Sequence, residues 1–147
     1  MAKTNARSLK KQDYEALSEF RYQLRRFLHF SEQAARGEGL TPLQYQLMLH
    51  VRGFPGREWA TVGELAERLQ MQPHGAVALI SRCEESGMVQ RKNSVGDRRQ
   101  VEVHLLPEGA SVLERLADLH RTELRSLRNT FRVEQITSFN DDDLGQD

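Results

Sequence analysis

The chain has 147 residues, with 21 Lys and Arg against 21 Asp and Glu, and a single cysteine, Cys83. This length fits one domain, or one domain with helical arms, and one cysteine excludes both an intramolecular disulfide and a zinc site built from several thiolates. No apolar run approaches the ~20 residues that span a bilayer, and the N-terminus lacks the apolar segment of a secretory signal, so we expect a soluble, cytoplasmic protein.

Charge is distributed unevenly along the chain, although the net charge is zero. Basic side chains outnumber acidic ones in residues 1–36, while residues 133–147 carry only acidic charges. Charge separated in this way indicates one side that faces a polyanion and another that repels it or is simply solvated.

Two helices are predicted in the first third of the chain. Leu17, Phe20 and Leu24 recur at helical spacing, which predicts an amphipathic helix from about residue 10 to 36, ended by glycine. The run Thr41-Pro42-Leu43-Gln44 has the form of a capping box with proline at the first helical position. The helix that it opens should end at residue 53, where a loop begins.

A pair of shorter helices follows, joined by a tight turn. Thr61 and Glu64 form a second capping box, which predicts a helix to about residue 69. The next helix should start at Pro73 and end at Gly87, a residue type that suits a left-handed C-cap. Its inward-facing stripe is expected at Val77, Ile80 and either Cys83 or Glu84.

Two strands are predicted next, over residues 88–92 and 99–106, on either side of a turn inside the basic stretch RKNSVGDRRQVEV. A long helix should start at Pro107, and a weaker helical piece is predicted over residues 133–139. The apolar positions of the long helix are Leu113, Leu116, Leu119 or His120, Leu124, Leu127 and Phe131.

This order of elements predicts a fold that is mainly α with a small β-ribbon. Two short helices joined by a tight turn form a helix-turn-helix, whose second helix can enter the major groove of DNA. A ribbon directly after that helix makes the lobe a winged helix-turn-helix, with further helices before and after it.

Residues 61–116 resemble the MarR (multiple antibiotic resistance regulator) family of bacterial transcription factors. The pieces that carry the resemblance are ELAERL, SRCEESGMVQR, DRR and LPEG, in this order and spacing. The resemblance implies a single domain over residues 1–147, with dimerisation helices at 10–36 and 107–140 and a DNA-binding lobe at 41–106. It also implies a homodimer that binds a pseudo-palindromic operator in double-stranded DNA, usually represses transcription, and is often released by a small ligand or an oxidant.

The turn between the two strands is the candidate wing tip. The resemblance implies that Arg98 or Arg99 enters the minor groove and that Asp97 orients it by ion pairing, with Arg91 and Lys92 adding positive charge nearby. A narrow minor groove concentrates negative potential, and a guanidinium is more weakly hydrated than an ammonium, so the chemistry suits this role. The alternative is a solvated hairpin with a surface ion pair.

The candidate recognition helix offers few polar side chains to base edges. Gln72 could pair with adenine, and His74 could donate to a base or a phosphate, or be a surface histidine without a role. Arg82 could reach a phosphate or make a local helix pair. The residues expected at the DNA are Thr61, whose helix N-terminus suits a phosphate, and Gln72, Pro73, His74, Gly75, Ser81 and Arg82.

The terminal helices would form the dimer interface through Leu17, Phe20, Leu116, Leu124, Leu127 and Phe131. The resemblance further implies an effector pocket between these helices and the lobe. Aromatic walls with one or two polar groups suit a small aromatic acid, and the alternative is that the same residues are simply core. The candidate lining residues are Phe27, His29, Phe30, Tyr45, Met48 and Trp59.

No catalytic pattern is present, so we predict a regulator that is not an enzyme and needs no cofactor or metal. The histidines lack the H-E-x-x-H spacing of a zinc site. Cys83 could sense oxidants, but its place in the apolar stripe favours a small buried hydrophobe. The competing function is a winged-helix module for protein–protein contact, in which DNA binding is weak or lost.

Overall fold

The computed structural model describes residues 8–97 and 99–126 of the chain. They divide into two compact units, one formed by residues 31–121 and the other by the segments before and after it. Helices α1 (Lys11–Gly37) and α5 (Pro107–Ser126) each contribute to both units. None of the described helices combines the length and apolar composition that crossing a bilayer requires.

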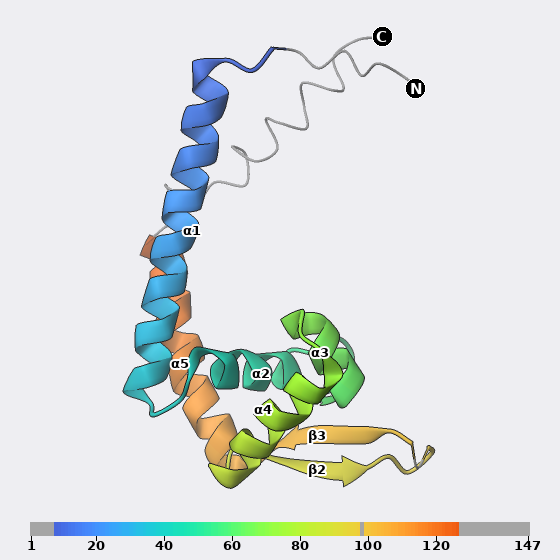
Figure 1. Ribbon diagram of the computed structural model, residues 1–147. Coiled ribbons are helices and arrows are strands. Elements are labelled where there is room, and N and C mark those ends of the chain that lie inside the picture. The colour runs from blue at the N-terminus through green and yellow to red at the C-terminus, as the bar shows by residue number, and fades with distance from the viewer. Residues whose placement is uncertain (1–7, 98, 127–147) are drawn as a thin grey trace, which may run out of the picture. The chain divides into compact units, whose positions relative to one another are not determined.

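The unit of residues 31–121 is a winged helix-turn-helix, which confirms the predicted fold class. Along the chain it contains α2 (Pro42–Arg52), β1 (Trp59–Thr61), α3 (Val62–Leu69), α4 (Pro73–Glu85), β2 (Val89–Asn93) and β3 (Val101–Leu105). The strands form an antiparallel sheet in the order β1-β3-β2. Figure 1 shows the β2–β3 ribbon extending beyond the helices that pack at its base.

The strands differ from the prediction in two ways. The ribbon strands occupy residues 89–93 and 101–105 instead of 88–92 and 99–106. The sheet also has a third strand, β1, in which Trp59 pairs with His104 and Thr61 pairs with Glu102. Three residues are too few for an alternating pattern to show in the sequence, so this strand exists because β3 offers it an edge.

Both predicted capping boxes are present, and they fix where α2 and α3 begin. Thr41 Oγ1 accepts from Gln44 N at 3.2 Å, and Thr41 N donates to Gln44 Oε1 at 2.9 Å. Gly87 has the predicted left-handed conformation, with φ of +74°. Gln70 ends α3 in the same conformation at φ of +52°, which makes the tight turn before α4.

The core lies between α2, α3, α4, the sheet and the first half of α5. On α4 the buried side chains are Ala76, Leu79, Ile80 and Cys83. The expectation that Val77 points inward is wrong: 43% of Val77 is exposed. The buried stripe is centred between Ala76 and Cys83, and a step of 100° per residue carries Val77 off that stripe to the flank of the helix.

Contacts of the buried His120 on α5 join this helix and the end of α1 to the core. The His120 ring stacks on Tyr45 with centroids 4.8 Å apart, and its nitrogens lie 2.6 Å from Leu116 O and 2.8 Å from Ser31 Oγ. A carbonyl only accepts, so Nδ1 donates to Leu116 O. Of the alternatives Leu119 and His120, the buried one is His120, which is 7% exposed, whereas Leu119 is 47% exposed.

The prediction that Leu116 lies in the dimer interface is wrong. It is 0% exposed and belongs to the core of this unit, so a partner chain has no access to it. The pattern that marked it apolar was right, but its neighbours are in its own chain.

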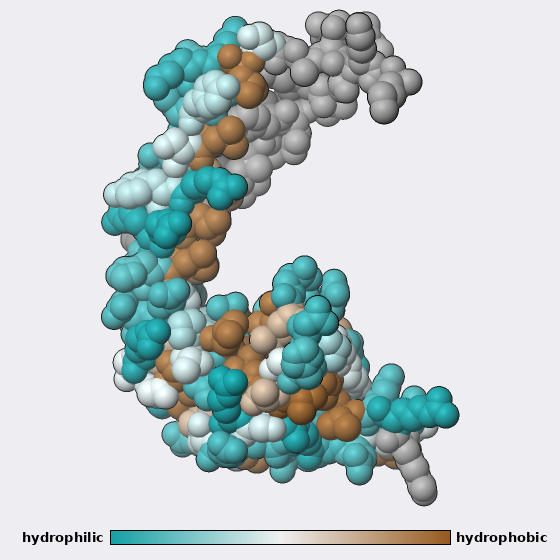
Figure 2. Space-filling view, viewed as in Figure 1, coloured by the Kyte–Doolittle hydropathy of each residue, from teal (hydrophilic) through white to brown (hydrophobic). Residues whose placement is uncertain are grey.

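The other unit is described over residues 8–30 and 122–126. Along α1, Phe20, Phe27 and Phe30 are half-buried, whereas several other large apolar side chains stay exposed. The exposed ones on this part of the chain are Leu9, Tyr14, Leu17, Tyr22, Leu28 and Leu124. Figure 2 shows brown side chains gathered along one edge of α1, with teal ones over much of the rest of its visible surface.

Candidate nucleic-acid interface

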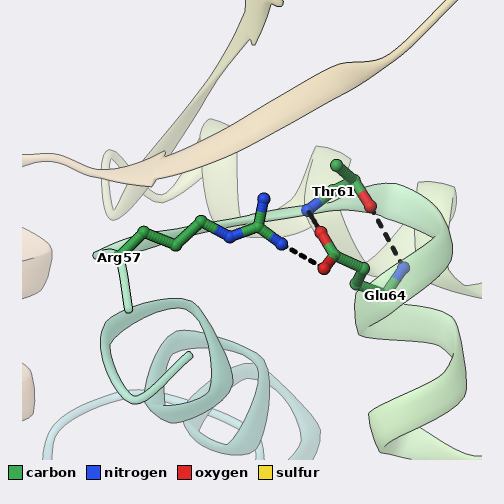
Figure 3. A network of polar contacts seen from close by, with 3 residues as sticks. All are labelled: Arg57, Thr61 and Glu64. Atoms are coloured by element: carbon green, nitrogen blue, oxygen red, sulfur yellow. Dashed lines mark hydrogen bonds and ion pairs between the residues drawn. The ribbon is translucent and has the colours of Figure 1, made fainter. Parts of the chain in front are cut away.

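Helix α3 starts in a polar network formed by Arg57, Thr61 and Glu64 (Figure 3). Glu64 N donates to Thr61 Oγ1 at 3.3 Å, and Thr61 N donates to Glu64 Oε1 at 2.9 Å. The second carboxylate oxygen of Glu64 accepts from the Arg57 guanidinium. Burial raises the pKa of Glu64, but the Thr61 hydrogen bonds and the charge of Arg57 outweigh it and lower the pKa below its usual value.

Arg57 itself contacts two aromatic rings. Its guanidinium carbon lies 4.3 Å from the Phe54 ring centroid and 3.9 Å from that of Trp59, and Trp59 stacks on His104 with centroids 6.0 Å apart. Trp59 was predicted to line an effector pocket; the structure places it in this stack, which connects the loop before α3 to strand β3. The sequence had not marked Arg57, because a lone arginine in a Gly- and Pro-rich loop has no pattern to identify it.

The first turn of α4 presents its polar side chains to solvent. Gln72 is the N-cap residue but makes no side-chain cap hydrogen bond, so its amide is not used in holding the helix. Gln72, Pro73 and His74 are exposed, and Gly75 is half-buried. These four predicted DNA residues therefore lie together at the start of α4. A hollow of about 540 Å³ adjoins them, and its lining is Gly63, Ala66, Glu67, Gln70, Met71, Gln72 and Pro73.

Further along α4, two predicted DNA residues contact each other. Arg91, on β2, donates to the Ser81 hydroxyl and to Val77 O at 3.1 Å, and its Nε lies 3.0 Å from a carboxylate oxygen of Glu84. Three contacts from one guanidinium fasten the ribbon to the outer flank of α4. Arg82, in contrast, is exposed on α4. Glu84 was expected at most as part of the inward stripe, and it serves here as an anchor for Arg91.

The wing tip is a hydrogen-bonded turn with exposed cations. Ser94 N donates to Gln100 O at 3.1 Å, and Gln100 N donates to Asp97 O at 3.1 Å. The Asp97 carboxylate accepts from the backbone N–H of Arg99 at 2.9 Å, so this aspartate shapes the turn. Lys92 and Arg99 are exposed, and Val95 is fully exposed at 106%. Arg98 lies outside the described residues.

The predicted effector residues fall in both units. Tyr45 and Met48 are 5% and 0% exposed and belong to the core, and burial raises the pKa of Tyr45. Phe27 and Phe30 are half-buried and His29 is exposed, all in the other unit. For Tyr45 and Met48 the structure gives a packing role within the core.

Cys83 lies in the core of the lobe. Its side chain is 0% exposed, and burial raises the pKa of its thiol to about 11. A buried thiol that stays protonated at neutral pH is a poor nucleophile, which favours the packing role over an oxidant sensor. In the part of the chain that the structure describes, no group of His, Cys, Asp and Glu side chains could hold a metal ion.

A short helix, a tight turn, a second helix with an exposed outer face and a basic ribbon define the class of winged helix-turn-helix proteins. A family model described as the MarR family matches residues 38–100 of the chain.

Curated relatives and solved structures also match the chain. The chain is 30% identical over 92 residues to an uncharacterized HTH-type transcriptional regulator, YsmB, of Bacillus subtilis, covering 58% of this chain and 63% of the relative. It is 28% identical over 96 residues to a putative transcriptional regulatory protein for the hcr operon of Thauera aromatica, covering 65% and 56%. The match thus spans less than two thirds of either relative. Both are described as regulators, in line with the prediction of a regulator that is not an enzyme.

Among solved structures, AbsC, a MarR family transcriptional regulator from Streptomyces coelicolor, has a TM-score of 0.69 at 22% identity over 92% of both chains. A mutant of MarR from E. coli, solved in complex with operator DNA, has a TM-score of 0.64 at 19% identity over 79% of this chain and 81% of that one. At these identities the likeness establishes the fold.

Proposed function

We propose that this protein is a sequence-specific, double-stranded-DNA-binding transcription regulator that acts in the bacterial cytoplasm as a homodimeric repressor. The observation that carries the proposal is the exposed start of α4, whose polar side chains are not used in capping the helix. Beside α4 stands a ribbon whose tip exposes Lys92 and Arg99. A helix of this kind fits the major groove, and a cationic hairpin fits the neighbouring minor groove or the phosphates.

The residues have separate roles in this proposal. Gln72 and His74 reach base edges from the first turn of α4, while Arg82 contacts a phosphate. Lys92, Arg98 and Arg99 carry the wing's positive charge to the DNA, and the Asp97 turn holds the tip in shape. Thr61 places the start of α3 near the DNA backbone, because a helix N-terminus favours a phosphate. Arg91 and Ser81 act indirectly, because they fasten the ribbon to α4.

Dimerisation through the unit of residues 8–30 and 122–126 is part of the proposal. Its support is the set of exposed apolar side chains on α1, together with Leu124 on α5, which is 51% exposed. Leu17 and Phe20 would pack against the partner; Leu127 and Phe131 lie outside the described residues. Two recognition helices about 34–36 Å apart would then meet successive major grooves of one pseudo-palindromic operator.

Release by a small aromatic acid is the remaining part of the proposal. The aromatic side chains of Phe27 and Phe30 and the exposed imidazole of His29 support it, since apolar walls with a polar group suit such a ligand. The ligand would act by favouring a conformation that binds DNA less tightly.

Selection from a random-sequence duplex library, followed by fluorescence anisotropy at several salt concentrations, tests DNA binding. We expect the selected sites to contain an inverted repeat and log K to fall steeply with log salt concentration. Arg99→Ala should lower that slope by about 0.9 for each phosphate that its guanidinium neutralises, summed over both wings of a dimer. Arg36→Ala, which removes the same charge from the last turn of α1, is the control and should leave the slope unchanged.

A module for protein–protein contact is the second candidate function. It is favoured by the small number of hydrogen-bonding side chains on the outer face of α4, where Arg91 already occupies the Ser81 hydroxyl. Failure to enrich any duplex, with weak binding to mixed-sequence DNA, would support this alternative. An unchanged salt slope in Arg99→Ala would show only that the wing does not contact the DNA.

A further inference from the structure

The middle of α4 presents an apolar surface where a recognition helix usually carries polar side chains. Val77 is 43% exposed, and His74 and Ala78 are exposed as well. Positions 74, 77 and 78 are three and four residues apart, so they share one outer face of the helix. Ala76 and Ile80, on the opposite face, are 0% exposed and hold this orientation in the core.

The polar groups around Val77 are already engaged within the chain. Its own carbonyl accepts from Arg91 at 3.1 Å, and the same guanidinium holds the Ser81 hydroxyl and Glu84. Arg91 therefore fixes the backbone at Val77 and uses the nearby hydroxyl. What the helix offers at this level is the pair of methyl groups of Val77 and the methyl of Ala78.

Only one common base presents an apolar group in the major groove. Thymine has its C5-methyl there, next to an O4 acceptor, whereas the other base edges present hydrogen-bonding groups. The surroundings of Val77 also suit DNA: His74 lies one turn before it, Arg82 is exposed on the same helix, and Lys92 and Arg99 are exposed on the ribbon. A cationic rim around a small apolar patch favours a polyanion that carries methyl groups.

We propose that Val77 is a specificity-determining residue that reads the C5-methyl group of a thymine in each half-site. The inference rests on the proposed DNA-binding function and adds a base preference to it. Val77 then selects thymine through van der Waals contact and desolvation, without a hydrogen bond.

The test uses duplexes selected from a random library, resynthesised with deoxyuridine in place of thymine at one position of each half-site at a time. Deoxyuridine keeps the base pairing and removes only the methyl group. We expect one position at which this change weakens binding about fourfold per half-site, the factor that corresponds to one buried methyl group. Anisotropy at fixed salt gives the dissociation constants.

Val77→Ala should bind the thymine duplex more weakly and lose the difference between thymine and deoxyuridine at that position. Val77→Thr, which keeps the shape but replaces a methyl group with a hydroxyl, should reduce the difference. Val95→Ala is the matched control, because it makes the same change at the fully exposed valine of the wing tip. It should keep the full thymine preference.

The outcomes separate the two levels of the proposal. If no duplex is selected or bound, the DNA-binding function fails. If duplexes are bound tightly but Val77→Ala keeps the same thymine-to-deoxyuridine ratio at every position, the role of Val77 is overturned and DNA binding stands. Circular dichroism and thermal unfolding of each variant show that it is folded before its binding is compared.

Discussion

Gly109, in the first turns of α5, occupies a place where a β-carbon does not fit. A β-carbon there would lie 2.1 Å from Met88 O and 2.9 Å from the carbon of the same carbonyl. Met88 O also accepts from Leu106 N at 2.9 Å, so the carbonyl is held in place by the chain that leads into the helix. Backbone atoms cannot move aside as a flexible side chain can.

Gly109→Ala should therefore destabilise the protein by about 2 kcal/mol or more, as overpacking does in a rigid core. Urea unfolding measures the change in the free energy of unfolding. Gly63→Ala is the control: a β-carbon there meets nothing within 4 Å, and the exchange should be neutral or stabilising by up to about 1 kcal/mol. Wild-type stability in Gly109→Ala would show that the start of α5 is not held against Met88.

Single residues show where sequence reasoning reaches its limit. The pattern around Cys83 predicted a buried position, and its burial is confirmed. The same pattern predicted that Val77 faces inward. Valine is apolar, and residues on either flank of α4 fit the helical spacing of a buried stripe. Gly109 was noticed only as part of LPEG, since its neighbour Met88 comes from a distant part of the sequence and is brought close by the fold.

At the scale of elements, the start of α3 depends on one carboxylate that serves both the capping box and Arg57. The folded state lowers the pKa of Glu64 from its ordinary value of 4.5. A group whose pKa is depressed on folding stabilises the protein above the ordinary value, and this contribution is lost as the pH falls through the folded-state pKa. Acidification below about pH 5 should thus weaken the start of α3.

Glu64→Gln should lower the free energy of unfolding at pH 7 by about 1 kcal/mol, the usual cost of a weakened cap. The difference from wild type should shrink as the pH falls below 4.5, because the wild-type carboxyl then becomes neutral too. Unfolding by urea at about pH 7, 5 and 3.5 checks this. Glu85→Gln, at an exposed position of α4, should change stability by less than about 0.5 kcal/mol at each pH. A difference that stays constant with pH would contradict the role of the ionised carboxylate.

Elements with a local signal were predictable from the sequence. The two capping boxes, the proline at the start of each of three helices and Gly87 gave helix boundaries close to those observed, because such signals act within one turn of chain. Strand β1 was missed for the opposite reason. Its pairing with β3 joins residues 59–61 to residues 102–104, and a short segment far from its partner carries no local pattern.

At the scale of the whole molecule, the proposed homodimer depends on exposed apolar side chains of α1. Leu17→Glu should weaken dimerisation on the order of 100-fold or more, since each symmetric interface loses two buried leucines and gains two buried charges. Sedimentation velocity over a range of concentrations measures the monomer–dimer equilibrium, and affinity for a selected duplex should fall with it.

Leu43→Glu is the control for this experiment. Leu43 is 43% exposed and Leu17 is 45% exposed, but Leu43 lies on α2 in the other unit. This variant should remain dimeric. If both variants behave alike, or if Leu17→Glu remains a dimer, the apolar side of α1 is not the interface.

The candidate site was only partly predictable. The residues at the start of α4 and at the wing could be proposed for the site because helix-turn-helix order and basic charge are visible in the sequence. That Arg91 and Ser81 bind each other was not visible, since a side chain's partner across two elements depends on how they pack. The same holds for Leu116, whose apolar character fits a partner chain as well as the core in which it lies.

The chain contains a single tryptophan, Trp59, which contacts both the Arg57 guanidinium and the His104 ring. Its indole emission therefore comes from one place only, the edge where β1 joins β3 just before α3. A spectroscopist can follow this edge without attaching a dye, during acid titration, refolding or the addition of a duplex. Because both neighbours are able to alter indole fluorescence, separation of the strand pair should be readable as a change in intensity from the native, unlabelled protein.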